Sequence, residues 1–323
     1  MALLEIKHLK TTFNLDGEVN PAVDDVSFSV EAGKTLAVIG ESGSGKSVTA
    51  LSILKLIDPP GKIESGEVLF NGVDLMKLPE KDLRSIRGNR IAMVYQDPLS
   101  SLNPMIKVGQ QIEEALKLHT KMDKHTLKQK TLDLMESVGI SDSALRYHYL
   151  PDKFSGGMRQ RLIIAMAIAC EPDLLIADEP TTALDVTIQA EILDLLRALK
   201  KRQNMAMILN THDLGVVSEM ADDVVVMYCG KVMEIADITA LFNKPLNPYT
   251  QALMTCMPRI DDPKRHLDTI PGHVPELSQI PKGCRFSNRC KYAFEKCGER
   301  LPELREVEKG HWSRCWLNEP SLV

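Results

Sequence analysis

The sequence has no long apolar segment. Its longest uninterrupted apolar run, Leu162–Cys170, is nine residues long, whereas a membrane-spanning helix needs about 20. The amino terminus has no basic stretch followed by an apolar one, so we expect no signal peptide. These absences predict a soluble chain, although such a chain can still dock onto a membrane protein.

An excess of positive charge is also missing. The formal net charge is -5, whereas a protein that binds nucleic acid usually carries a basic face, so we expect no nucleic-acid partner. The chain is 44% hydrophobic and 26% charged, as is usual for a globular protein with a core. Without an export signal, its seven cysteines are more consistent with metal binding or burial than with a disulfide framework.

Short apolar runs alternate with helical stretches from the start to about residue 235. Asn71-Gly72 suits a tight turn and predicts a hairpin over Glu67–Val73. From Val108 to about Ala144 the pattern is helical, which predicts a helical insertion. The predicted strands are Val26–Val30, Thr35–Ile39, Ile91–Tyr95, Leu174–Ala177, Ala206–Asn210 and Val224–Met227.

The composition changes after about residue 238. Nine of the 18 prolines lie between Pro245 and Pro320, which makes regular helices and strands hard to sustain there. We therefore expect one domain over residues 1–237 and a loop-rich extension over residues 238–323. Such an extension has little core of its own, so something else must hold it together.

The segment Gly40–Ser47 reads GESGSGKS between the predicted strand Thr35–Ile39 and the helical run Val48–Leu56. This fits the phosphate-binding pattern G-x-x-x-x-G-K-[ST] in its strand–loop–helix context, which disfavours a merely flexible Gly/Ser loop. Backbone N–H groups and the helix amino terminus would bind phosphate. Lys46 would reach the β- and γ-phosphates, and the Ser47 hydroxyl would ligate Mg²⁺. The predicted ATP-binding residues here are Ser42, Gly43, Ser44, Gly45, Lys46, Ser47 and Val48.

A second motif, Leu174–Glu179, is an apolar strand that ends in two carboxylates. Asp178 would lie near the magnesium ion, and Glu179 would polarise the attacking water as general base. A strand that ends in acids is weak evidence alone, but together with the phosphate loop it predicts a nucleotide hydrolase.

The segment Phe154–Arg161, FSGGMRQR, resembles the signature of ABC ATPases, which more commonly have Gln at the position of Met158. The resemblance extends from residue 3 to about residue 236. It implies that Ser155, Gly156 and Gly157 open a helix and bind a phosphate of the ATP held by a partner subunit. Two chains would then enclose two nucleotides.

The resemblance also implies four further site residues. Gln96 would be the glutamine that touches Mg²⁺ and the attacking water, and His212 would contact the γ-phosphate. Asp185, in the segment Ala183-Leu184-Asp185, would lie at the dimer interface, and Phe13 would stack on adenine. The implied fold is α/β, a P-loop NTPase (RecA-like) core with an antiparallel β subdomain and a helical subdomain over about residues 97–160. The loop-rich, cysteine-containing extension would follow this core.

Four local sequences resemble the ATPases of oligopeptide and dipeptide importers. They are Tyr95–Pro104, Met158 within the signature, Asn247–Leu253 and the tail Ile270–Cys284. The implied function is ATP hydrolysis that energises peptide uptake at the cytoplasmic face of the membrane. The implied partners are a second, similar ATPase in a heterodimer, two membrane-spanning permease subunits and, indirectly, an extracytoplasmic solute-binding protein.

Three alternatives to peptide import are open. Relatives of this architecture also carry nickel, metal chelates or other small solutes. A soluble ABC ATPase of DNA repair or iron–sulfur assembly is disfavoured, because the long coiled-coil insertions of the repair relatives are missing, and translation-associated relatives usually carry two ATPase units. A redox sensor with secondary ATPase activity is the third.

Four cysteines, Cys284, Cys290, Cys297 and Cys315, follow the spacing C-x5-C-x6-C-x17-C. This is not the C-x2-C pairing typical of structural zinc. Four thiolates can hold a [4Fe–4S] cluster, and the family resemblance implies one here, with zinc or unligated thiols as alternatives. The basic residues among them would offset the charge of the cluster; these are Arg285, Arg289, Lys291, Lys296 and Arg314.

Overall fold

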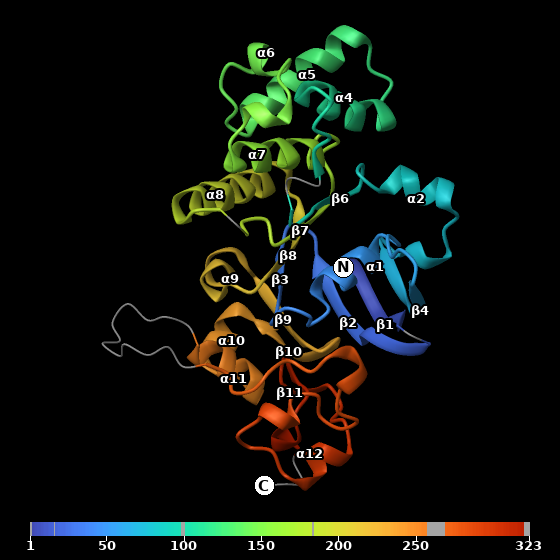
Figure 1. Cartoon of the computed structure of the whole chain (residues 1–323), viewed down its shortest axis with the longest axis vertical. Coiled ribbons are helices and arrows are strands. Elements are labelled where there is room, and N and C mark those ends of the chain that lie inside the picture. The colour runs from blue at the N-terminus through green and yellow to red at the C-terminus, as the bar shows by residue number, and fades with distance from the viewer. Residues whose placement is uncertain (1, 16, 98–100, 183, 257–268, 320–323) are drawn as a thin grey trace. The chain divides into compact units, whose positions relative to one another are not determined.

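The computed structural model describes residues 2–15, 17–97, 101–182, 184–256 and 269–319 (Figure 1). The chain divides into two compact units. The helical unit comprises residues 31–34 and 77–209, and the β-rich unit comprises residues 2–30, 35–76 and 210–323 where they are described.

The first sheet of the β-rich unit has the strand order β2-β1-β4-β5. Phe70 pairs with Val73 across a turn in which Asn71 and Gly72 have φ of 48° and 78°, so the predicted hairpin is confirmed. The strand predicted at Val26–Val30 is the end of a longer one. The strands are β1 (Ala2–Leu15), β2 (Glu18–Glu31), β4 (Gly61–Phe70) and β5 (Val73–Asp74).

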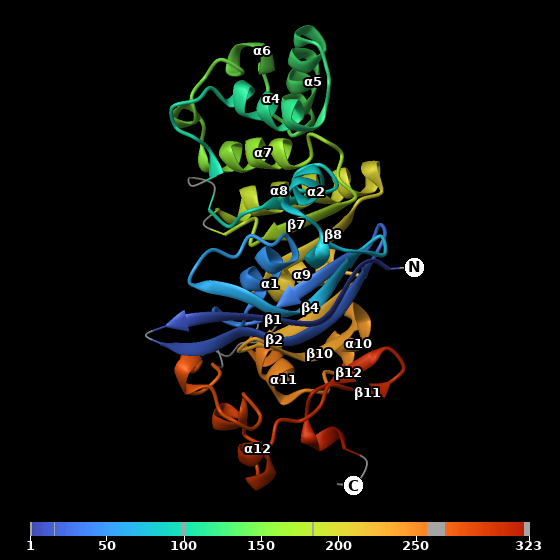
Figure 2. The same ribbon diagram turned by 90° about the vertical axis from the view of Figure 1, so that its right-hand side faces the viewer.

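The first strand, β1, was missed because its apolar residues alternate with charged ones. Leu4 and Ile6 are buried, whereas Glu5 and Lys7, which each follow one of them, are partly exposed. An alternation of every second residue is typical of a strand with one buried and one solvent-exposed face. A search for continuous apolar runs does not detect it. Figure 2 shows β1, β2 and β4 side by side in this sheet.

The other strands of the β-rich unit follow the order β11-β12-β10-β9-β3. Residues of β3 and β9 are buried almost throughout, and Ile39 pairs in parallel with Val226. Continuous apolar runs suit strands that are buried on both faces. Figure 1 labels β10 and β11, and β12 lies between these two strands in the sheet. The strands are β3 (Thr35–Ile39), β9 (Asp223–Tyr228), β10 (Lys231–Asp237), β11 (Arg305–Glu308) and β12 (His311–Ser313).

Three helices of the β-rich unit begin at a side chain that accepts hydrogen bonds from the first turn. Asp213, Asp237 and Asn247 cap α9, α10 and α11 in this way. The helices are α1 (Lys46–Ile53), α9 (Leu214–Met220), α10 (Ile238–Asn243), α11 (Pro248–Thr255) and α12 (Glu295–Glu299). Short 3₁₀ turns are Leu75–Lys77 at the junction of the units, Leu277–Gln279, Ser287–Arg289 and Trp316–Asn318.

The helical unit contains the strand order β8-β7-β6, in which β6 and β7 are parallel. Its helices confirm the predicted helical stretch that begins at Val108. The strands are β6 (Ile91–Val94), β7 (Leu174–Asp178) and β8 (Ala206–Thr211), whose last two residues belong to the β-rich unit. The helices are α2 (Glu80–Ile86), α4 (Val108–His119), α5 (Lys124–Ser137), α6 (Ser143–Arg146), α7 (Gly156–Ala167) and α8 (Val186–Gln203), with a 3₁₀ turn at Pro151–Lys153.

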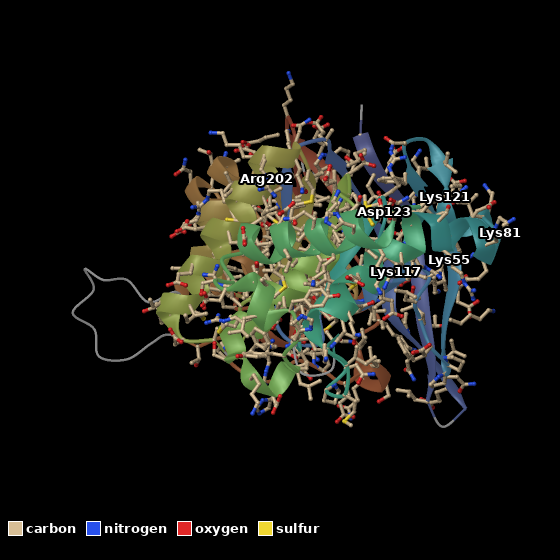
Figure 3. All side chains as sticks on the ribbon, turned by 90° about the horizontal axis from the view of Figure 1, so that it is seen from above. Lys55, Lys81, Lys117, Lys121, Asp123 and Arg202 are labelled. Carbon is tan, nitrogen blue, oxygen red and sulfur yellow. The ribbon has the colours of Figure 1, made fainter. Side chains whose placement is uncertain are left out.

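Helices α4 and α5 are separated by a turn that contains Lys121 and Asp123, both labelled in Figure 3. The Asp123 carboxylate accepts hydrogen bonds from the backbone N–H groups of His125 (2.9 Å) and Thr126 (3.2 Å). This cap satisfies donors that have no partner within the helix. In the described part of the chain, no helix is both long and apolar enough to span a bilayer.

Gly109 in α4 provides a test of the packing in the helical unit. A Cβ atom at this position would lie 2.1 Å from a carbon of the Tyr147 ring. Gly109→Ala should therefore lower the free energy of unfolding by about 1–3 kcal/mol through overpacking, measured by urea denaturation of the full chain. Gly298→Ala is the control, because its Cβ would meet no atom within 4 Å. Equal midpoints for the two variants would contradict the packing described here.

Candidate functional site

The predicted phosphate loop runs from the end of β3 to the start of α1. Gly40, Gly43 and Gly45 have φ of 152°, 78° and 103°. Residues other than glycine rarely adopt such values. A Cβ atom on Gly40 would lie 2.1 Å from the Met227 carbonyl oxygen, and one on Gly45 would lie 2.6 Å from that of Ala22. The loop conformation therefore requires its glycines.

Lys46, the first residue of α1, is buried against the loop. Its Nζ donates to the carbonyl oxygens of Gly40 (2.8 Å) and Glu41 (3.2 Å). Ser42 and Gly43 are exposed. A cation, exposed loop backbone and the positive end of an eight-residue helix together favour the binding of an anion.

The other two predicted nucleotide-binding residues of the β-rich unit are Phe13 and His212. Phe13 lies on β1 opposite Gly61 of β4, and it is partly exposed. A Cβ on Gly61 would lie 2.7 Å from the Phe13 ring. The ring can therefore occupy this position only because residue 61 has no side chain. His212 is exposed in the turn between β8 and α9.

In the helical unit, the structure brings Gln96 and Glu179 together. Glu179 Oε2 accepts hydrogen bonds from Gln96 Nε2 (3.1 Å) and from Thr182 Oγ1 (2.9 Å). Asp178 is the buried last residue of β7. Glu179 follows it with φ of 48°, which is an uncommon value for a glutamate. Strained backbone of this kind can be part of a functional site.

Thr182 is a site residue that the sequence analysis missed. It lies in the turn after Glu179, where its own N–H donates to the Glu179 carbonyl oxygen at 3.2 Å. A hydroxyl three residues beyond a carboxylate is the signal that could have identified it.

The predicted signature residues lie at the start of α7. Ser155 caps this helix and accepts a hydrogen bond from the Met158 N–H at 3.3 Å. Ser155 and Gly156 are exposed, whereas Gly157 is buried. A Cβ on Gly157 would lie 2.5 Å from the Ile188 side chain of α8. Gly157 therefore allows close helix packing, and the two residues before it leave the helix amino terminus accessible.

Asp185 caps α8 by accepting a hydrogen bond from the Ile188 N–H at 3.0 Å. The next side chain, Val186, is 84% exposed. An apolar side chain so open to water is consistent with a surface that contacts another chain. Ala183 and residues 98–100 of the predicted motifs lie outside the described residues.

The four clustered cysteines, Cys284, Cys290, Cys297 and Cys315, line one small cavity of about 20 Å³. All four are free thiols. Burial raises the pKa of Cys284 to about 11 and that of Cys315 to about 12, and it also raises the pKa of Cys290.

Four convergent sulfur donors are a set that fits an iron–sulfur cluster or zinc in kind. Nevertheless, no group of three or more His, Cys, Asp or Glu side chains within the described ranges is arranged to hold a metal ion. The thiols therefore share a cavity without a preformed coordination geometry.

Arg285 and Arg289, two of the basic residues expected to offset the charge of a cysteine-ligated cluster, have partners outside the cysteine cavity. Arg285 donates to the Asp24 carboxylate and to the Cys229 carbonyl, and Arg289 is ion-paired with Glu41. A carboxylate binds a guanidinium group strongly, because the two groups are opposite in charge and match in geometry. Both arginines therefore connect the cysteine segment to other parts of the β-rich unit.

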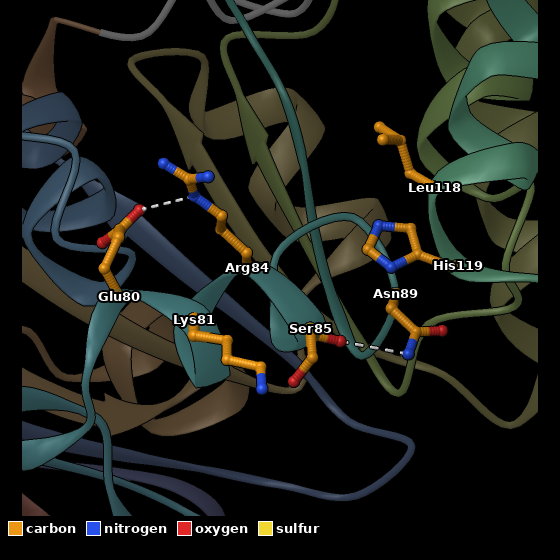
Figure 4. Close-up of a pocket in the computed structure, with 7 residues that line it drawn as sticks. All are labelled: Glu80, Lys81, Arg84, Ser85, Asn89, Leu118 and His119. Carbon is orange, nitrogen blue, oxygen red and sulfur yellow. Dashed lines mark hydrogen bonds and ion pairs between the residues drawn. The ribbon is translucent and has the colours of Figure 1, made fainter.

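A larger hollow of about 650 Å³ in the helical unit contains none of the predicted site residues (Figure 4). The cations on its wall are partly neutralised there, since Arg84 Nε donates to Glu80 at 3.4 Å. The hollow is open to solvent and its wall carries both acidic and basic side chains, so its lining does not indicate a particular ligand. The lining residues are Glu80, Lys81, Arg84, Ser85, Asn89, Leu118 and His119.

The solved structures that the chain resembles are ABC cassettes. A dimeric structure of MJ0796, a bacterial ABC transporter cassette, matches with a TM-score of 0.66 and 25% identity, covering 73% of this chain and 98% of that one. CbiO1 from Clostridium perfringens, part of the ABC transporter complex CbiONQ, matches with a TM-score of 0.63 and 25% identity, covering 75% and 91%. Fold and motifs together define an ABC-type ATPase of the P-loop NTPase class.

The family is defined more narrowly by sequence. The ABC transporter family matches residues 23–182, and the family described as the C-terminal region of oligopeptide/dipeptide transporters matches residues 233–297. The chain is 47% identical to the dipeptide transport ATP-binding protein DppD of Escherichia coli over 98% of its length and 96% of that protein. It is 48% identical to the oligopeptide transport protein AppD of Bacillus subtilis over 98% and 97%. The chain belongs to this family of ATP-binding proteins of peptide ABC transporters.

Proposed function

We propose that this chain is the ATP-hydrolysing subunit that powers uptake of dipeptides or oligopeptides across the cytoplasmic membrane, at whose inner face it docks. The observation that carries the proposal is its similarity over 98% of its length to dipeptide and oligopeptide transport ATP-binding proteins. The phosphate loop and the Glu179 site supply the chemistry that this role requires.

In the proposed mechanism, the β-rich unit supplies the groups that bind ATP. Lys46 and the loop backbone would hold the phosphates, and Ser47 and Asp178 are proposed to hold Mg²⁺, which would neutralise part of the phosphate charge. Phe13 stacks on the adenine, and His212 contacts the γ-phosphate. The glycine conformations and the buried Lys46 support the phosphate-binding part of this assignment.

The helical unit supplies the proposed hydrolytic base. Glu179 would accept a proton from the attacking water, and Gln96 would help to hold that water and the metal. The hydrogen bonds from Gln96 and Thr182 to Glu179 support this assignment, because they orient the carboxylate. Ionised carboxylates accept such bonds, so Glu179 can act as a base once water replaces one of these donors.

The proposed dimer partner is a second, similar ATPase subunit. Its ATP would be bound by the amino terminus of α7, at Ser155, Gly156 and Gly157, of which the first two are exposed, with Asp185 at the interface. The exposed Val186 supports a contact surface there, and the MJ0796 cassette is described as dimeric. Two permease subunits, and indirectly a solute-binding protein, complete the proposed transporter.

We propose that Cys284, Cys290, Cys297 and Cys315 hold a [4Fe–4S] cluster, with zinc as the alternative. Their thiols line one cavity, and a cluster would crosslink a segment that has few regular elements. We propose the domain boundary near residue 237, because the two family matches cover 23–182 and 233–297. We propose the helical subdomain at about 97–160, because α4, α5 and α6 lie within it.

Metal content tests the cluster. Protein purified without oxygen should be brown and contain about four irons per chain, because four thiolates bind one such cluster. Cys290→Ser should lose the colour, and Cys256→Ser, a cysteine outside the cavity, should keep it. One zinc per colourless chain would establish the alternative, and metal-free protein with reactive thiols would exclude both.

Transport tests the function as a whole. The chain should co-purify with two integral membrane subunits, and vesicles that contain the assembly should take up labelled peptides only with MgATP and the binding protein. Uptake of nickel or a metal chelate without peptide uptake would favour the alternative substrate. ATP hydrolysis by a chain that binds no membrane subunit would favour a soluble ABC ATPase.

A further inference from the structure

Glu41, the second residue of the phosphate loop, is held at each of its polar groups. Its N–H donates to Tyr249 Oη at 2.9 Å, and its carbonyl oxygen accepts from Lys46 Nζ at 3.2 Å. Its carboxylate accepts two hydrogen bonds from Arg289, at 2.8 Å and 3.0 Å. Two of these three partners belong to the chain beyond residue 237.

Arg289 is itself fixed by its surroundings. Its side chain is 5% exposed, and its Nε donates to the Pro271 carbonyl oxygen at 2.9 Å. A further hydrogen bond of 3.2 Å joins its Nη1 to Tyr228 Oη. With Glu41 and the Ile270 carbonyl oxygen (3.4 Å), four residues hold this buried guanidinium group. It therefore has little rotamer freedom left and can act as a rigid support.

A cluster of aromatic side chains lies next to the Arg289 guanidinium group. The ring centroids of Tyr228, Tyr249 and Phe286 lie 4.6–5.4 Å apart. The Arg289 guanidinium carbon lies 5.9 Å from both the Tyr228 and Phe286 ring centroids. These rings fix the phenol oxygen that binds the Glu41 N–H, because buried aromatic rings are stiff and closely packed.

Two costs of nucleotide binding explain why such a support matters. A loop with three glycines loses much conformational freedom when it is ordered around a phosphate, and an anchored loop has already lost part of it. A carboxylate within a phosphate-binding loop also repels the anion unless a cation neutralises it. The bidentate ion pair between Arg289 and Glu41 lowers both costs, because it anchors the loop and neutralises the carboxylate.

We propose that Arg289 is a positioning residue that, through Glu41, holds the phosphate loop in its nucleotide-binding conformation. The proposal rests on nucleotide binding at this loop and assigns part of the affinity to the C-terminal segment. It predicts a selective effect: the affinity for nucleotide falls, whereas the hydrolysis rate at saturation does not.

Equilibrium binding of a fluorescent ATP analogue (mant-ATP with Mg²⁺) to the purified full chain provides the test. Arg289→Gln should raise the Kd about tenfold, and Arg289→Lys should fall between, because lysine keeps the charge but loses the fork. KM for ATP should rise in parallel, with kcat within about twofold of the wild type. Adding Glu41→Gln to Arg289→Gln should recover part of the affinity, since it removes the unpaired carboxylate.

Arg305→Gln is the matched control, because Arg305 pairs with Glu319 at 3.0 Å in the same segment and contacts no residue of the loop. Its Kd should equal that of the wild type. Equal Kd values for Arg289→Gln and the wild type would overturn the inference, as would a loss of kcat at unchanged KM. If the wild type itself binds no mant-ATP, the proposed ATPase function fails instead. If Arg289→Gln does not fold, Tyr249→Phe decides in its place and should raise the Kd.

Discussion

Replacing Glu179 with Gln should lower the rate of ATP hydrolysis about a thousandfold while ATP remains bound. Gln has nearly the same shape as Glu but cannot accept a proton, so the variant keeps the site and loses the base. The hydrogen bonds from Gln96 and Thr182 can still be made to the amide oxygen, so the loop after β7 should keep its conformation. The measurement is phosphate release under saturating MgATP.

A second readout distinguishes loss of the base from loss of the fold. The Glu179→Gln variant should accumulate as an ATP-bound dimer in size-exclusion chromatography, because it stalls after the subunits close. Glu171→Gln is the control, since Glu171 is an exposed acid paired with Lys130. Hydrolysis within about tenfold of the wild type would exclude Glu179 as the general base.

Replacing Lys46 with Ala should weaken ATP binding about a hundredfold and abolish measurable hydrolysis at millimolar ATP. Lys46 is a buried cation whose Nζ lies against the carbonyl oxygens of Gly40 and Glu41. Without it, those carbonyl dipoles remain in the phosphate site with no positive charge to offset them. Binding of mant-ATP measures the affinity, and circular dichroism checks the fold.

Lys62→Ala is the matched control for this variant. Lys62 is exposed and pairs with Glu64 at 3.2 Å, so its removal should change the affinity by less than about twofold. Wild-type affinity in Lys46→Ala would mean that the phosphates bind elsewhere and would contradict the assigned loop.

The sequence predicted what depends on local pattern. The phosphate loop needs three glycines, a lysine and a helix start within a few residues, and each is recognisable without knowledge of the fold. The strands β3, β7 and β9 were predicted because burial on both faces gives continuous apolar runs. The hairpin at Asn71-Gly72 was predicted because its turn requires positive φ.

Contacts between distant residues could not be predicted in the same way. Glu41 and Arg289 are 248 positions apart, and nothing local to either residue indicates the other. The basic residues near the cysteines were therefore interpreted from their neighbours in sequence, whereas Arg285 and Arg289 bind carboxylates from the first part of the chain.

The pairing of β12 with β10, through Glu234 with Ser313 and Ile235 with Trp312, has a consequence for attempts to shorten the protein. A chain cut near residue 237 would leave the backbone N–H and C=O groups of β10 open along a mostly buried, apolar strand. Such an edge is a template for pairing with other chains. The intact chain ends this row instead with β11, whose Arg305, Glu306 and Glu308 are charged. The C-terminal segment thus protects the cassette from edge-to-edge aggregation, independently of any metal it binds.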